Sequence, residues 1–241
     1  MNKWAGWDLF KDLRGVAAFR GLCAGLLLSL GLSLQPGVAH ADDMGFQLVS
    51  VGDPGRCGRN CPAVIAAEGE ITDSTPSQFL EFVRENVSQA NLHAVVFLNS
   101  PGGKVAASME LGRAFRRIGA AVIVAQVDPN SPGRVNSFIG GRCLSACVYA
   151  LIGARKRVIP PESLVGIHRM FAYVDGVDAR GDEERYRLYD NGTMRSILSH
   201  YTGMMGVSPA LITMAEHISS DRIHILTRRE ISRYRLGSSR F

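Results

Sequence analysis

Long apolar runs, nucleotide-binding loops and blocks of like charge are all missing from this 241-residue sequence. Its longest apolar run, 22–34, is about 13 residues, whereas a helix that spans a bilayer needs about 20. No G-x-x-x-x-G-K-S/T motif occurs, so the sequence contains no P-loop for ATP. Because it also has no basic block and no aromatic-interleaved basic stripe, nucleic acid is not an expected partner.

The first forty residues have the features of an export signal. Basic side chains precede the apolar run, and Gln35-Pro36-Gly37 ends it. Residues 39–41, Ala-His-Ala, then form the small-x-small pattern at which such signals are cleaved. We therefore expect a signal peptide over 1–41, cleavage after Ala41 and a periplasmic or secreted protein. An uncleaved N-terminal membrane anchor is the alternative. The basic residues are Lys3, Lys11, Arg14 and Arg20.

The remaining chain, 42–241, has the size of a single domain. Of the 27 basic and 22 acidic residues in the sequence, four and two lie in 1–41, which leaves a nearly balanced 23 and 20. Four cysteines also remain, and an even count in an exported chain suggests disulfides, although the spacing does not choose among three pairings. A zinc site is the alternative, but two C-x3-C pairs without nearby histidines fit it less well. The cysteines are Cys57, Cys61, Cys143 and Cys147.

The order of strands and helices in 42–241 predicts an α/β fold with mostly parallel strands. Apolar, β-branched runs are typical of buried strands, and apolar residues at helical spacing mark the helices. The predicted strands are 46–51, 63–71, 94–100, 120–127, 156–159 and 163–168. The predicted helices are 75–90, 104–119, 144–154, 180–203, 208–218 and one that begins after Thr227, where Glu230 completes a capping box.

Three short motifs could carry chemistry. In NSPGGKV, 99–105, two glycines let the backbone turn its N–H groups toward an anion or a developing oxyanion. In GGRCLSACVYALIGA, 140–154, Ser145 begins a helix, where it could be a nucleophile or a cap for free N–H groups. In SLVGIHR, 163–169, an apolar strand ends in His168, a candidate general base. Each motif taken alone also fits a purely structural role.

Together, and with the strand pair KRVIPPESLVGIH, these motifs resemble the ClpP-type serine peptidases of the ClpP/crotonase superfamily. The resemblance runs over about 69–237 and includes the tail ILTRREISRYRLG. It implies a repeated β-β-α spiral core followed by C-terminal helices, and acyl transfer without a cofactor or a metal. By this resemblance Ser145 is the nucleophile and His168 the general base, and the backbone N–H groups of Gly103 and Ala146 stabilise the oxyanion.

The third position of the catalytic triad departs from the family pattern. The register places Ile223 there, with Asp221 two residues earlier. Asp221 is therefore the candidate acid; another group from a loop, a Ser–His dyad and a loss of catalysis are the alternatives. The related signal-peptide peptidases use a lysine base, and Lys104 and Lys156 are the only lysines in 42–241.

The resemblance and the export signal together predict an ATP-independent serine peptidase that cleaves peptides or unfolded proteins. No ATPase partner is expected, because an ATP-driven unfoldase lacks its energy source outside the cytoplasm. A catalytically inactive ClpP-like binding or assembly module is the alternative, and acyl-CoA chemistry is a minor one. Family members stack into rings, so a homo-oligomer is plausible. A disulfide from Cys143 or Cys147 would fix the loop that carries Ser145.

Overall fold

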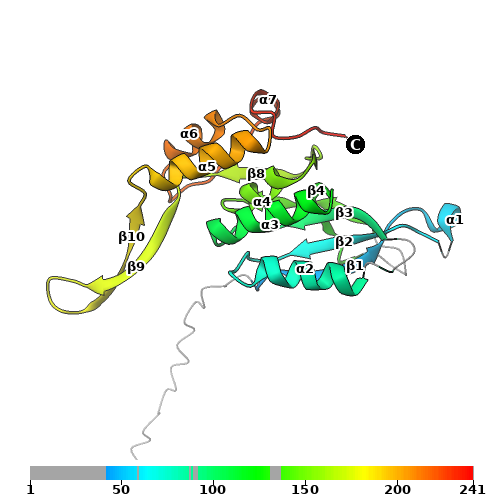
Figure 1. Cartoon of the computed structure of the whole chain (residues 1–241), viewed down its shortest axis with the longest axis horizontal. Coiled ribbons are helices and arrows are strands. Elements are labelled where there is room, and N and C mark those ends of the chain that lie inside the picture. Colours follow the sequence, from blue (N-terminus) through cyan, green and yellow to red (C-terminus); the bar gives the residue numbers. More distant parts are fainter. Residues whose placement is uncertain (1–41, 59, 87, 89–91, 131–136, 241) are drawn as a thin grey trace, which may run out of the picture. The chain divides into compact units, whose positions relative to one another are not determined.

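The structure of the protein is a computed structural model that describes residues 42–58, 60–86, 88, 92–130 and 137–240 (Figure 1). These residues belong to one compact unit, His40–Phe241. The predicted signal peptide, 1–41, lies outside the described residues and stays a prediction. No helix in the described part of the chain is both long and apolar enough to cross a membrane.

The main sheet combines six strands. They are β1 (Gly45–Ser50), β2 (Ala63–Glu68), β3 (Leu92–Asn99), β4 (Ala121–Val127), β5 (Phe138–Gly140) and β7 (Lys156–Val158). Strands β2, β3, β4 and β7 are parallel, whereas β1 and β5 pair antiparallel with β2 and β4. Their apolar, β-branched runs suit parallel strands, which are covered on both faces. The predicted α/β class with mostly parallel strands is confirmed.

A second sheet contains the strands that lead into the candidate site. It consists of β6 (Arg142–Leu144), β8 (Leu164–Ile167) and β11 (His224–Ile225), in the order β11-β8-β6. Isolated bridges extend it to the segments that follow β2 and β3, because Ser100 pairs with Cys143 and Ile71 with Gly103. Successive units of the chain thus give a strand to the main sheet and a short segment to the second, as the β-β-α repeat predicts.

Three helices follow units of this repeat. They are α2 (Thr75–Asn86), α3 (Val105–Arg117) and α4 (Cys147–Gly153). Phe79 of α2 and Phe115 of α3 are fully buried, and their rings meet edge to face with centroids 5.0 Å apart. This contact explains the apolar spacing from which both helices were predicted.

Helices α3 and α4 cross at two glycines. A Cβ atom added at Gly153 would lie 2.3 Å from the carbonyl carbon of Gly112. A Cβ atom at Gly112 would lie 2.9 Å from the carbonyl oxygen of Tyr149. Both distances are shorter than carbon atoms tolerate, so the close approach of the two helices requires glycine at both positions.

The prediction of a single helix over 180–203 is wrong for its first half. Strand β10 (Glu183–Tyr189) occupies this part and pairs antiparallel with β9 (Phe171–Val177) in a separate hairpin (Figure 1). The turn forms because the Asp178 carboxylate accepts hydrogen bonds from the N–H groups of Arg180 and Asp182, at 2.8 and 2.9 Å. Asp side chains often stabilise turns in this way.

The C-terminal helices of the predicted fold are present. They are α5 (Thr193–Met204), α6 (Ala210–Glu216) and α7 (Arg228–Arg233), and a short helix α1 (Pro54–Cys57) precedes β2. The capping box at α7 is confirmed, because Thr227 and Glu230 each accept a hydrogen bond from the other's backbone N–H. Of these helices, α6 lines the small pocket that contains Ser145 and His168.

Candidate active site

Ser145 lies in the turn between β6 and α4, with an unusual backbone conformation. Its φ angle is +53°, in the left-handed region that residues other than glycine rarely adopt. Such a conformation costs about 1–3 kcal/mol and is most often found at functional sites. The first cap residue of α4 is Ala146, and no side chain caps the helix. The interpretation of Ser145 as a helix cap is therefore wrong.

The two strands of a parallel pair bring Ser145 and His168 to the same edge of the second sheet. Leu144 at the end of β6 pairs with Gly166 of β8, and His168 follows β8 directly. The N–H of Ser145 donates to the Gly166 carbonyl at 2.8 Å, which ties the turn to the strand that leads to His168. Register alone thus places the two side chains as neighbours.

The imidazole of His168 is oriented by a backbone carbonyl. Its Nδ1 lies 2.8 Å from the carbonyl oxygen of Arg169. Because a carbonyl can only accept a hydrogen bond, Nδ1 carries the proton. In the neutral ring, Nε2 is then left with a lone pair, which is the form that a general base requires.

Ser145 and His168 line one small pocket together. Apolar side chains from α4, β8 and α6 make up most of its wall, and its volume is about 10 Å³, close to the space that one water molecule needs. The structure shows no hydrogen bond between Ser145 and His168, and such bonds often form only when substrate is bound. The other lining residues are Val148, Tyr149, Ile167, Leu211, Ile212 and Ala215.

The glycine turn after β3 approaches Ser145 closely. The φ angles of Gly102 and Gly103 are +120° and +131°. A Cβ atom added at Gly102 would lie 2.9 Å from the Cβ of Ser145 and 3.2 Å from the nitrogen of Ala146. At Gly103 it would lie 2.1 Å from the carbonyl oxygen of Ile71. Glycine is therefore required at both positions for the turn to fit between the two segments.

The amide of Gly103 is left available by its neighbours. Ile71 donates its N–H to the Gly102 carbonyl and accepts from the N–H of Lys104, each at 2.8 Å. In such a bridge the peptide N–H of the residue between them points the other way. Among the backbone hydrogen bonds of the described turns and loops, none is donated by the N–H of Gly103 or of Ala146. Both can therefore serve a ligand.

Asp221 forms no hydrogen bond or ion pair with His168 in the structure. Its carboxylate forms an ion pair with Arg187 of β10 and accepts a hydrogen bond from the hydroxyl of Ser219 at 3.2 Å. Hydrogen bonding to Arg187 holds the pKa of Asp221 below its usual value. Asp221, the candidate acid, therefore has other partners, and the ring of His168 is held by a carbonyl instead.

The structure selects one pairing of the four cysteines. Cys143 is bonded to Cys147, and Cys57 to Cys61. Cys143 and Cys147 are fully buried, and the short ring that they close contains Ser145. The four thiols are consumed in disulfides, and the described residues contain no cluster of metal-binding side chains.

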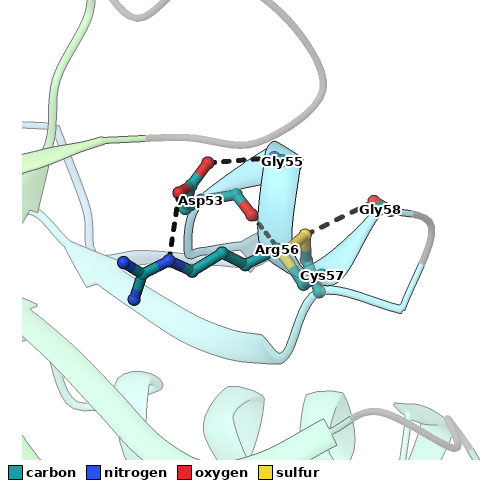
Figure 2. The surroundings of a disulfide bond; sticks show 6 residues. Asp53, Gly55, Arg56, Cys57 and Gly58 are labelled. Carbon is teal, nitrogen blue, oxygen red and sulfur yellow. Dashed lines mark hydrogen bonds and ion pairs between the residues drawn. A yellow bond between two sulfur atoms is a disulfide. The ribbon is translucent and has the colours of Figure 1, made fainter.

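The second disulfide joins Cys57, the partly buried last residue of α1, to Cys61, which is buried just before β2 (Figure 2). Asp53 stabilises this segment, because its carboxylate accepts a hydrogen bond from the N–H of Gly55 at 2.9 Å and forms an ion pair with Arg56 at 3.5 Å. The sulfur of Cys57 lies 3.1 Å from the Asp53 carbonyl oxygen. None of these residues lines the pocket that contains Ser145.

Sequence reasoning missed two charged or polar residues at the site. Tyr149 lines the pocket, and burial raises its pKa, with a further contribution from the nearby charge of Glu216. Glu216 also forms an ion pair with Arg169, the residue whose carbonyl orients His168. Only the position of Arg169 directly after the candidate base could have signalled this arrangement, because Glu216 is distant in sequence. The alternative lysine base, Lys104, is exposed and does not line the pocket.

Comparisons with known proteins gave the following result. No protein-family model and no curated protein matches the sequence. Among solved structures, the chain is similar to the 1510-N membrane-bound stomatin-specific protease in a serine-to-alanine mutant form. The match has 18% identity, covers 73% of this chain and 78% of that one, and has a TM-score of 0.49. A lysine-to-alanine mutant of the same protease, in complex with a substrate peptide, is 19% identical, with coverages of 73% and 74% and a TM-score of 0.47.

Proposed function

We propose that this protein is a serine peptidase of the ClpP type that cleaves peptides or unfolded proteins without an ATPase partner. Ser145 is the nucleophile and His168 is the general base. The observation that carries the proposal is the non-capping, left-handed Ser145 in one pocket with a histidine whose Nδ1 donates to a carbonyl. A structural serine has no need of this costly conformation.

The geometry supports an acyl-transfer mechanism. His168 Nε2 takes the proton of Ser145 Oγ as the oxygen bonds to the substrate carbonyl carbon. The N–H groups of Gly103 and Ala146 then stabilise the negative oxygen of the tetrahedral intermediate. When the scissile C–N bond breaks, His168 gives its proton to the leaving amine, and water releases the acyl group in a second cycle of the same steps.

Labelling with a fluorophosphonate tests this proposal. The full-length chain, produced under oxidising conditions, should form a covalent adduct at Ser145 and cleave unfolded protein substrates. Ser145→Ala and His168→Ala should abolish both activities. Ser196→Ala removes an exposed serine outside the pocket and is the matched control. Absence of labelling from the folded wild-type protein would overturn the proposal.

A substitution of Asp221 separates a dyad from a triad. If Asp221 moved to complete a triad, Asp221→Asn should lower the rate of peptide cleavage by about 10⁴-fold, as loss of a triad carboxylate does. With the Arg169 carbonyl as the group that orients His168, we expect a change of about twofold or less, since an exposed ion pair contributes little. The rate of cleavage decides between them.

A non-catalytic binding or assembly module is the second candidate function. The pocket has the volume of about one water molecule, and side chains of α6 form part of its wall. A peptide could enter this pocket only if α6 moved. Without such a movement, the chain would have to bind a partner at another surface. Unlabelled wild-type protein that still captures a partner when Ser145 is alanine would favour this function.

Export and self-association belong to the same proposal. Two disulfides suit an oxidising compartment such as the periplasm. Exposed apolar side chains on β10 and α5 support contact with a second copy. They are Tyr186, Leu188, Ile197 and Met204. Fractionation of cells and the mass of the purified protein in solution test the two points.

A further inference from the structure

The peptide group that orients His168 is itself held by α6. The Arg169 carbonyl accepts the hydrogen bond from His168 Nδ1 at 2.8 Å. The N–H of the same residue donates to the carbonyl of Ile218, just beyond the end of α6, at 2.9 Å. Arg169 therefore links the candidate base to a helix that is almost fifty residues away in sequence.

The side chain of Arg169 repeats this link. Its Nε lies 3.6 Å from a carboxylate oxygen of Glu216, the last residue of α6. Its guanidinium lies over the ring of Tyr189 in β10, 4.5 Å from the ring centroid. The Nε atom is buried without a hydrogen bond, so the Glu216 carboxylate is its partner of opposite charge.

Glu216 is well placed for this role. Only 14% of its side chain is exposed, against 69% for Asp221, which pairs with Arg187. A buried carboxylate needs a partner of opposite charge, because burial without one is costly. The low exposure of Glu216 therefore favours its ion pair with Arg169, the residue whose backbone carbonyl His168 contacts.

We propose that Glu216 and Arg169 are positioning residues for His168. The carboxylate of Glu216 fixes the Arg169 side chain, and with it the peptide whose carbonyl holds the imidazole with Nε2 facing the Ser145 pocket. This inference rests on the proposed peptidase function. It assigns to Glu216, acting through Arg169, the positioning task that the sequence assigned to Asp221.

Kinetics of fluorophosphonate labelling of the full-length chain test the inference. Glu216→Gln keeps the shape of the side chain and removes its charge. We expect the maximal rate of labelling to fall about tenfold to a hundredfold, because small displacements of a catalytic group cost this much, while the half-saturating probe concentration stays unchanged. Arg169→Gln should give the same loss. The charge-exchanged double variant, Arg169→Glu with Glu216→Arg, should recover most of the rate.

Asp175→Asn is the matched control, because it breaks an ion pair with Arg185 that lies at 2.7 Å on the exposed hairpin. Its labelling rate should equal that of the wild type. If Glu216→Gln and Arg169→Gln also label at the wild-type rate, the inference is wrong while the peptidase function stands. If the wild type is not labelled, the peptidase function itself fails.

The hydrogen bond that orients His168 can also be measured without any catalytic step. The slowly exchanging Nδ1 proton of His168, assigned by its loss in His168→Gln, should give a downfield NMR signal in the wild type. The signal should disappear or shift in Glu216→Gln and return in the charge-exchanged variant. An unchanged signal in folded Glu216→Gln would overturn the inference. If the single variants fail to fold, the signal of the charge-exchanged variant decides, and its absence would count against the inference.

Discussion

Two disulfides with the same C-x3-C spacing close rings of equal size in very different surroundings. The ring of Cys143 and Cys147 is buried, contains Ser145 and joins the second sheet to α4. The ring of Cys57 and Cys61 (Figure 2) has one partly buried and one buried cysteine, and neither lines the pocket. Each ring contains a residue with positive φ, a serine in the first and Gly58 in the second. Glycine adopts this conformation without strain, whereas serine does not. The comparison shows that spacing indicates a bond, and only the surroundings indicate a function.

The largest difference between the rings should appear on reduction. Cys61 is buried but Cys57 is only partly buried, so a dithiol reductant can reach the Cys57 sulfur in the folded protein. Cys143 and Cys147 react only when the surrounding core opens, and an opening that costs about 3 kcal/mol slows reduction by about a hundredfold. Mass spectrometry of alkylated thiols over time measures both rates. Equal rates would show that the ring around Ser145 is as accessible as the ring of Cys57 and Cys61.

Removal of each disulfide should separate their effects on activity. In Cys143→Ala with Cys147→Ala, Ser145 is free to leave its strained conformation, which costs about 1–3 kcal/mol, so labelling should slow by about tenfold to a hundredfold. Cys57→Ala with Cys61→Ala should label at the wild-type rate. The rate of fluorophosphonate labelling is the readout. If both double variants behave alike, the ring around Ser145 has no role in positioning it.

The same double variants should differ less in stability. Closing a ring of this length stabilises the folded chain by about 2 kcal/mol in the chain-entropy model. We expect that full loss when Cys143 and Cys147 are replaced, because their ring is part of the core. The loss should be smaller for Cys57 and Cys61, since their loop can open while the core stays folded. Urea denaturation monitored by circular dichroism gives both free energies of unfolding.

The smallest effects concern the positive-φ residue inside each disulfide ring, Gly58 and Ser145. Gly58→Ala should lower the free energy of unfolding by about 1 kcal/mol through backbone strain, since an added Cβ atom meets no neighbour within 4 Å. Conversely, Ser145→Gly should be more stable than Ser145→Ala by a similar amount of about 1 kcal/mol. Thermal unfolding of the three variants checks both signs. A less stable Ser145→Gly would show that the turn is not strained.

Local patterns predicted the regular elements well. Apolar runs such as 94–100 and 120–127 indicated buried parallel strands, and Thr227 with Glu230 indicated the start of α7. These features depend on residues near in sequence, so the sequence contains the information. The helix predicted over 180–203 failed because the hydrogen bonds of the Asp178 turn and pairing with β9 favoured a strand in its first half.

The candidate site was predictable only in part. Ser145 lies at the start of a recognisable helix and His168 at the end of a recognisable strand, so their positions could be expected, whereas strand β6 before Ser145 was not predicted. The positive φ of Ser145 could not, because serine at a helix start usually caps the helix. The ion pair of Arg169 with Glu216 could not be predicted from the sequence either, since it depends on how α6 packs. Tertiary packing, rather than sequence spacing, decided which carboxylate is linked to the base through Arg169.

The crossing of α3 and α4 at Gly112 and Gly153 has a mechanical consequence. The first helix begins just after the turn that contains Gly103, and the second begins just after Ser145. Their contact therefore acts as a clamp between the nucleophile and one of its two oxyanion donors. A methyl group at Gly153 would wedge the helices apart and transmit that displacement along both axes to the pocket. The distance between the Ser145 hydroxyl and the Gly103 amide would then depend on the contact of Gly112 with Gly153, which lies outside the pocket.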